Sequence, residues 1–396
     1  MTTPWIEIEN REHLDVPAGP GYNDYNSQAQ FACQVQVLPH QEWVKFKWGF
    51  NASALFDEFI ERQKLFLESQ YEVRHQLGTE APDFRTLTFR FINRPGEGLL
   101  VSIVGKIHAK SKKEAEESAL GYYREVNAIF PYDYKLFPAV TRQEFLQTAG
   151  REILDGITDK GEIAQIKRLE IPLSPVRNSP FLQGVWRSGP RAHEQIWRSL
   201  ATYPNPVLLN ISLRCTVLYE KERERLMKFG EEISSIHEQH LNQQTLSAMQ
   251  QWNKKHVERR LAPWGKYFYL QIHVASASGL KDDLFRTIGT SLTLSGGESI
   301  PGYQVVSPER TQAWQNRLKN LDVIFSDSYL PVPRLSEVAD LEEVFAAVRL
   351  PYSPPEAGFP NVNFITTIDE QMDQPAQSTF QGEDRGRVSM DQRMTG

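Results

Sequence analysis

Two histidines three residues apart, with an acid beside the first, are the clearest candidates for chemistry in this chain. They are His237 and His240, and the acid is Glu238. Zinc hydrolases place two histidines four residues apart on a helix so that both face the metal, and a glutamate serves as the base. Here the spacing is three, so these residues are weak metal ligands, and a solvated helix face explains them better. A metal-dependent hydrolase built on them stays open as an alternative function.

A small basic cluster follows in the same part of the chain. It consists of Lys254, Lys255, Arg259 and Arg260, with Trp252 close by. Cations beside aromatic rings can contact phosphates and stack on bases. Acidic residues are interleaved with them, which favours a charged helical surface or a contact with another protein. A nucleic-acid-binding module that uses these four cations is the second alternative.

Nucleotide chemistry has no support in the sequence. A phosphate-binding loop needs glycines, a lysine and a hydroxyl residue at set spacings, and no stretch of the 396 residues supplies them. Single cysteines, Cys33 and Cys215, lack a convincing histidine and acid for nucleophilic catalysis. We therefore expect no catalytic residues, no cofactor and no enzymatic activity.

Composition limits the partners and the compartment. The net charge is −6, and the isoelectric point is about 5.9, which argues against a broad phosphate-binding surface. Two cysteines cannot build a disulfide framework. The sequence holds no apolar run of the roughly 20 residues that span a bilayer, and the amino terminus does not have the pattern of a signal peptide. We expect a cytoplasmic protein that does not insert into membranes.

The first half carries the strongest secondary-structure signals. Two β-rich runs, 85–93 and 99–108, are joined by a short glycine-containing loop and predict a hairpin. Ser111 and Glu114 then form the pattern of a capping box, which predicts a helix that ends at Pro131. Strands followed by a helix are most simply buried as a small antiparallel sheet with helices on one face.

The second half repeats this order. A predicted edge strand at 163–172 precedes a proline-rich connection, a strand at 207–218, a long helical stretch and another strong strand. The helical stretch is too long for one ordinary helix, so it predicts an antiparallel helical hairpin. The fold class is therefore α+β, with two related α/β units whose small antiparallel sheets are covered by helices. The predicted divisions are an extended arm at 1–29, a first α/β domain at 30–175, a second α/β domain at 176–350 with a helical insertion at about 219–261, and a proline-rich exit with a polar tail at 351–396.

The stretch 330–364 is organised differently from the rest. A short amphipathic helix at 342–348 is flanked by prolines and leads into an Arg-Leu-Pro-Tyr sequence and a turn-rich run. We interpret this stretch as a docking surface for a partner. Its candidate contact residues are Arg334, Leu335, Glu342, Glu343, Arg349, Leu350, Pro351 and Tyr352.

In these features the chain resembles the amino-terminal, non-motor region of the HerA/FtsK superfamily of DNA-pumping ATPases, which includes the conjugative and type IV secretion motors. The resemblance rests on the hairpin and helix of 86–130, the strand at 134–140, the strand at 206–218 with the acidic helix after it, the segment around 288–293, and above all the stretch from Arg334 to Tyr352. In such proteins a comparable stretch leads into the motor domain. We expect that motor to be absent from this chain, so the catalytic residues of the family transfer to no position here.

These observations together predict a non-catalytic structural or adaptor component of a multi-protein assembly. The resemblance implies a separately encoded HerA/FtsK-like motor ATPase as the partner in trans. Assembly as a homo-oligomer or hetero-oligomer is compatible with this role, and any DNA contact is expected to be indirect. Defence, conjugation, secretion and DNA processing all remain open as the biological setting.

Overall fold

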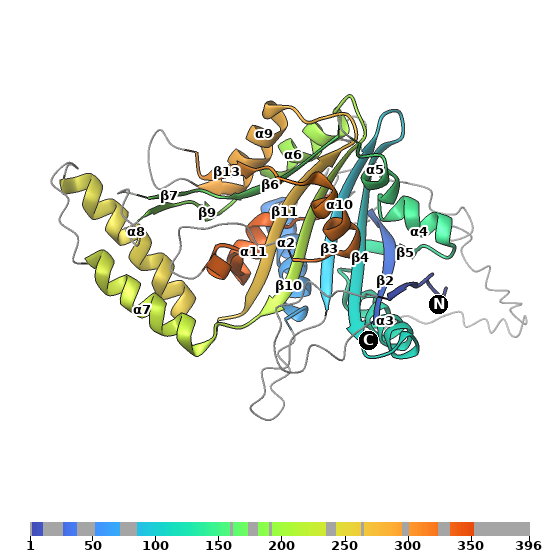
Figure 1. The fold of residues 1–396 in the computed structure, drawn as a ribbon, viewed down its shortest axis with the longest axis horizontal. Coiled ribbons are helices and arrows are strands. Elements are labelled where there is room, and N and C mark those ends of the chain that lie inside the picture. The colour runs from blue at the N-terminus through green and yellow to red at the C-terminus, as the bar shows by residue number, and fades with distance from the viewer. Residues whose placement is uncertain are drawn as a thin grey trace, which may run out of the picture.

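The computed structural model describes residues 2–10, 27–37, 52–71, 85–158, 161–172, 181–189, 192–234, 243–262, 265–294, 301–323 and 333–351. They form a mixed α+β fold, a mainly antiparallel sheet covered by helices (Figure 1), which confirms the predicted fold class. The first half contains β1 (Glu7–Asn10), β2 (Ser27–Val37), α2 (Ala52–Ser69), β3 (Thr86–Arg94), β4 (Gly98–Ala109), α3 (Lys112–Ile129), β5 (Tyr134–Pro138), α4 (Arg142–Thr148) and α5 (Arg151–Asp155).

The second half begins with β6 (Glu162–Arg168) and the short strands β7 (Glu170–Pro172), β8 (Phe181–Gln183) and β9 (Val185–Trp186). It continues with α6 (Ala192–Ala201), β10 (Val207–Thr216), α7 (Glu220–Ser234), α8 (Gln243–Leu261), β11 (Tyr267–Ser276), α9 (Asp282–Leu292), β12 (Thr293–Leu294), β13 (Tyr303–Val306) and α10 (Thr311–Asn320). The last elements are the 3₁₀ helix η2 (Pro333–Ser336), β14 (Val338–Asp340) and α11 (Leu341–Ala347).

One ten-stranded sheet runs through both halves. Its order is β1-β2-β4-β3-β10-β11-β6-β13, while β5 pairs with β2 and β14 pairs with β11. In each half a strand and a helix precede a two-stranded hairpin, a second helix and a short strand that pairs with the first strand. The first half achieves this with β2, α2, β3–β4, α3 and β5, and the second with β6, α6, β10–β11, α9 and β13. The helical pair α7 and α8 is inserted between β10 and β11 and projects from the sheet (Figure 1).

The two halves meet at a central seam of paired backbone. Strand β3 pairs antiparallel with β10, from Leu87 opposite Leu213 to Asn93 opposite Val207. Strand β6 lies before the boundary that we predicted at 175/176, yet it pairs with β11 and β13 on either side. We predicted one edge strand at 163–172; this is wrong for β6, which has a partner on each side, while the end of that range forms the separate strand β7, which among the described strands pairs only with β8. The division into domains stays a prediction.

Each face of the sheet has its own helical cover. The larger apolar core combines one sheet face with residues of α2, α3, α6, α9 and α11, among them Phe59, Tyr122, Trp197, Ile288 and Val344. The opposite face is covered by α4, α5 and α10 through smaller clusters. In the view of Figure 1, α10 and α5 lie in front of the sheet and α2 lies behind it. This arrangement places α11 on the same side as the principal core.

Polar side chains are buried between the sheet and α10. Arg90 of β3 donates to Asn210 Oδ1 at 2.9 Å, to the carbonyl of Leu318 at 2.6 Å and to the carbonyl of Ala149. Lys106 of β4 pairs with Asp322 at 2.8 Å, and both side chains are buried. Because buried charges are costly unless they are paired or hydrogen-bonded, these contacts fix the position of the carboxyl end of α10.

The local predictions in the first half agree with the structure. Ser111 Oγ accepts from the Glu114 backbone N–H at 3.2 Å at the start of α3, and Glu114 Oε2 accepts from the Lys110 backbone N–H at 3.2 Å. Among the described residues, no helix is both long and apolar enough to cross a membrane.

Candidate protein-docking site

The stretch that we predicted as a docking surface contributes a strand, β14, to the ten-stranded sheet. Strand β14 pairs antiparallel with the beginning of β11, with Val338 opposite Tyr269 and Asp340 opposite Tyr267. Just before it, the Leu270 backbone N–H donates to the Glu337 carbonyl at 2.9 Å. The short helix α11 therefore starts from a fixed point on the sheet.

Asp340 sets the start of α11. Its Oδ1 accepts from the Glu343 backbone N–H at 3.0 Å, and Glu343 Oε2 accepts from the Asp340 backbone N–H at 3.1 Å. This reciprocal capping box satisfies backbone donors that a helix otherwise leaves unpaired. Asp340 Oδ1 also accepts from Arg259 of α8 at 2.6 Å, so the cap and the helical hairpin are joined.

Glu343 is the centre of a buried group of charges. Its Oε1 accepts from Arg168 of β6 at 2.9 Å, and its Oε2 lies 2.6 Å from Arg260 of α8. Each of the three side chains is at most 2% exposed. Burial alone would raise the pKa of Glu343, but the positive charges of Arg260 and Arg168 outweigh burial and lower this pKa to about 2. Glu343 is therefore ionised over the whole physiological pH range.

Burial has the opposite effect on Arg260. It lowers the pKa of this guanidinium, although the Glu343 charge opposes the change. His256, one turn earlier on α8, has a pKa well below its ordinary value because of burial and of the charges of Arg260 and Arg168. The histidine is therefore neutral, and Glu343 is left as the counter-charge shared by two guanidinium groups.

Arg168 also holds the turn that precedes α11. Its Nη2 donates to the carbonyls of Leu335 at 3.2 Å, Ser336 at 2.9 Å and Val338 at 3.0 Å. Its neighbour Lys167 lies 3.1 Å from Glu337 Oε1. Successive residues of a strand point to opposite faces, so these two cations of β6 hold the segment from both sides.

The exit of the segment is tied to the first half of the chain. Gln63 Oε1 of α2 accepts from the Leu350 backbone N–H at 2.9 Å, and the Gln63 amide donates to the Tyr134 hydroxyl at 2.9 Å. The same hydroxyl donates to the Leu350 carbonyl at 3.3 Å. At the surface, Lys64 of α2 pairs with Glu342 at 2.8 Å. Segment 333–351 thus contacts both halves of the fold.

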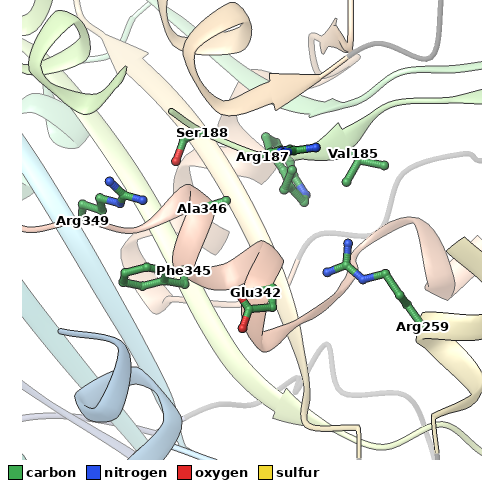
Figure 2. Close-up of a pocket in the computed structure, with 9 residues that line it drawn as sticks. Val185, Arg187, Ser188, Arg259, Glu342, Phe345, Ala346 and Arg349 are labelled. Carbon is green, nitrogen blue, oxygen red and sulfur yellow. The ribbon is translucent and has the colours of Figure 1, made fainter. Parts of the chain in front are cut away.

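A hollow of about 390 Å³, which we call the arginine hollow, lies beside α11. In Figure 2, Val185, Arg187 and Ser188 lie across this hollow from α11, and Arg259 comes from α8. Arg349 stacks on the ring of Phe345, with 5.0 Å between the guanidinium carbon and the ring centre. The lining residues are Val185, Trp186, Arg187, Ser188, Arg259, Glu342, Phe345, Ala346 and Arg349.

The predicted docking residues fall into two groups. Leu335, Glu343, Arg349, Leu350 and Pro351 are buried within the chain, so they support the segment from inside. Glu342 has a side chain that is 64% exposed, and Glu342 and Arg349 both line the arginine hollow. The side chain of Arg334 and the whole of Tyr352 lie outside the described residues. Direct contact of these positions with a partner stays a prediction.

The predicted basic cluster is divided by the structure. Lys254 and Lys255 are exposed on α8, whereas Arg259 and Arg260 turn toward segment 333–351 and pair with Asp340 and Glu343. The cluster and the docking stretch, which the sequence presents as separate features, are thus in direct contact. Use of all four cations on one nucleic acid would require Arg260 to leave its buried partner.

The two weak metal candidates, His237 and His240, and the acid of the alternative hydrolase, Glu238, lie outside the described residues. Within the described ranges, no group of three or more histidine, cysteine, aspartate or glutamate side chains could hold a metal ion. The metal-dependent hydrolase stays a prediction that the structure does not test.

The sequence did not identify the residues of β6 and α2 that contact segment 333–351 and hold it in place. Arg168, Lys167 and Gln63 were not singled out, although one signal was present. Two adjacent cations, Lys167 and Arg168, end strand β6, and a buried cation requires a counter-charge. The two glutamates that meet them, Glu337 and Glu343, lie about 170 residues later, and nothing in the spacing identifies that pair.

No family model matches the chain, and no curated protein matches it in sequence. The family resemblance described above therefore rests on the residues that carry it.

Proposed function

We propose that this chain is a non-catalytic adaptor that docks on a separately encoded motor ATPase of the HerA/FtsK type. The single observation that carries the proposal is the attachment of segment 333–351 to both halves of the fold. This segment resembles the stretch that leads into the motor domain in HerA/FtsK proteins. A partner bound there would be held against the ten-stranded sheet through Arg168, Arg260 and Gln63.

The contacts of the segment suit an attachment point for a partner. Glu343 joins α11 to β6 and α8, and Leu350 joins the exit to α2 and β5. These contacts attach the segment to both halves of the fold. In the proposed complex, movement of a bound motor would therefore be passed to both halves through α11 and Leu350.

The test begins with the tagged full chain, recovered from its own cells, and an ATPase identified among the proteins recovered with it. The two purified proteins are then mixed and analysed by size-exclusion chromatography with light scattering. We expect a complex of fixed stoichiometry and a change in ATP turnover by the motor when the chain is added.

A charge reversal at the exposed position of the segment makes the test specific. Glu342→Arg should change the dissociation constant of the complex at least tenfold, because it alters the charge by two units at an exposed position beside the arginine hollow. Glu231→Arg is the matched control, because Glu231 is an exposed acid on α7. A monomeric chain that neither binds a motor ATPase nor changes its turnover would refute the proposal.

A further inference from the structure

The arginine hollow has an excess of positive charge, although the chain as a whole carries −6. Three guanidinium groups line it, those of Arg187, Arg259 and Arg349, and they come from three separate parts of the chain. Glu342 is the one acid among its lining residues. Three cations brought together from distant positions form a local site for an anion.

The acids nearest the hollow are already engaged. Glu342 pairs with Lys64 at 2.8 Å, and Asp340 serves both the cap of α11 and Arg259. A guanidinium has five N–H donors, so Arg259 keeps donors that Asp340 does not use. Arg187 is exposed, and no hydrogen bond or ion pair of its side chain is seen within the described part of the chain.

The walls of the hollow add a buried hydroxyl and two aromatic surfaces. Ser188 Oγ is buried and makes no hydrogen bond among the described residues, and it lies in the lining. Trp186 and Phe345 supply apolar surface beside it. Behind the wall, burial and the charge of Arg349 lower the pKa of His193 to about 3, so His193 adds no charge at neutral pH.

We propose that the arginine hollow binds the carboxylate side chains of an acidic, partly apolar segment of the partner protein. Arginine forks bind carboxylates through paired N–H donors, and the Ser188 hydroxyl would donate to the same group. An apolar neighbour of the acid would pack on Trp186 and Phe345. This inference rests on the proposed docking function, because it takes the acidic segment from the protein that docks there.

Two features favour a carboxylate over the phosphates of a nucleic acid. The hollow is a single compact site of about 390 Å³, whereas a nucleic acid needs a track of cations that follows its backbone. The acids of α7 and the acidic net charge of the chain would repel an extended polyanion. A short segment with one or two carboxylates meets less of this repulsion.

The test uses a fluorescein-labelled peptide of sequence GELEELG and its uncharged counterpart GQLQQLG. Fluorescence anisotropy with the full chain should show at least tenfold tighter binding of the acidic peptide, with an affinity that falls as salt is added. Arg187→Gln should weaken this binding about fivefold to tenfold. Lys254→Gln, which removes an exposed cation of α8 outside the hollow, should leave it unchanged.

Several outcomes would overturn the inference. These are equal binding of the two peptides, an equal effect of Arg187→Gln and Lys254→Gln, or preferential Arg187-dependent binding of a short DNA duplex or of inorganic phosphate. Failure of the carboxylate site and failure of the proposed docking function give different results. A motor complex that forms while the acidic peptide fails to bind rejects only the carboxylate site. Arg187-dependent peptide binding without any motor complex rejects only the motor as the partner.

Discussion

Glu343 of α11 lies 2.6 Å from the buried guanidinium of Arg260 on α8, and this pair joins the projecting helical hairpin to segment 333–351. The same carboxylate pairs with Arg168 of β6 and closes the cap of α11. One side chain therefore connects a helix terminus, a sheet strand and the hairpin. The stability of segment 333–351 depends on that connection.

Removal of the Glu343 charge should destabilise the fold strongly. Glu343→Gln leaves Arg168 and Arg260 buried without a counter-charge, and we expect a loss of about 3–5 kcal/mol in the free energy of unfolding, measured in urea. Glu342→Gln is the control, because it removes a surface ion pair and should cost at most about 1 kcal/mol. Equal losses in the two variants would show that the buried group is not what holds the segment.

The exit of the segment offers a second test, at Tyr134. Its hydroxyl accepts from Gln63 and donates to the Leu350 carbonyl. Tyr134→Phe leaves these groups unpaired inside the protein and should cost about 1–3 kcal/mol. Tyr132→Phe is the matched control. Tyr132 is 58% exposed, and phenylalanine keeps the ring under Arg62, so the change should stay within about 0.5 kcal/mol. A loss of the same size in both variants would contradict the role of the Tyr134 hydroxyl.

Two helical glycines should respond in opposite ways to alanine. A Cβ at Gly289 in α9 would overlap the ring of Tyr303, and overpacking costs about 1–3 kcal/mol. At Gly121, exposed on α3, a Cβ meets nothing within 4 Å. Gly121→Ala should therefore gain about 0.5–1 kcal/mol from helix propensity. Thermal unfolding of both variants measures the contrast, and a rise in Tm for Gly289→Ala would disprove the close packing of α9 on β13.

The protein should begin to lose stability at about pH 6.5, a higher pH than that at which carboxylates take up protons. Burial lowers the pKa of His273 to about 3, while an unfolded histidine takes up its proton near pH 6.5. This contribution to stability is complete above about pH 6.5 and is lost as the pH falls toward 3. By linkage, one such histidine accounts for about 2 kcal/mol at about pH 5.

The measurement compares urea unfolding at pH 8 and pH 5 for the wild type and His273→Phe, which preserves a ring against Trp314. The variant should lose about 2 kcal/mol less between the two pH values. Glu343 contributes little to this comparison, because between pH 5 and pH 8 its carboxyl is ionised both in the fold, with a pKa of about 2, and in the unfolded chain, with a pKa of about 4.3. An unchanged pH dependence would mean that His273 accepts a proton in the folded state.

Local patterns predicted the parts of the fold that are stabilised locally. The hairpin of β3 and β4, the Ser111 cap of α3 and the antiparallel pair α7 and α8 follow from alternation, capping and length. The helix that we predicted at 342–348 is observed at Leu341–Ala347. In these cases the residues that determine the structure lie within a few positions of one another.

The contacts that build the candidate site lie far apart in the sequence. Arg168 meets Glu343 across 175 positions, and Gln63 meets Leu350 across 287. Pairing of β3 with β10 likewise depends on which strand edges remain open after the local hairpins form, and alternation within a strand does not specify its neighbour. The short helix of segment 333–351 could be predicted from the sequence, but the distant residues that support it could not.

The central seam has a consequence for synthesis of the chain. Strand β3 gains its second partner only when β10 has been made, more than 100 residues later. At roughly 5–20 residues per second, the edge of β3 stays uncovered on the ribosome for about 5–20 s. An unpaired strand edge is a template for aggregation. A fragment that ends before β10 would therefore keep this β3 edge open and would be a route to misassembly.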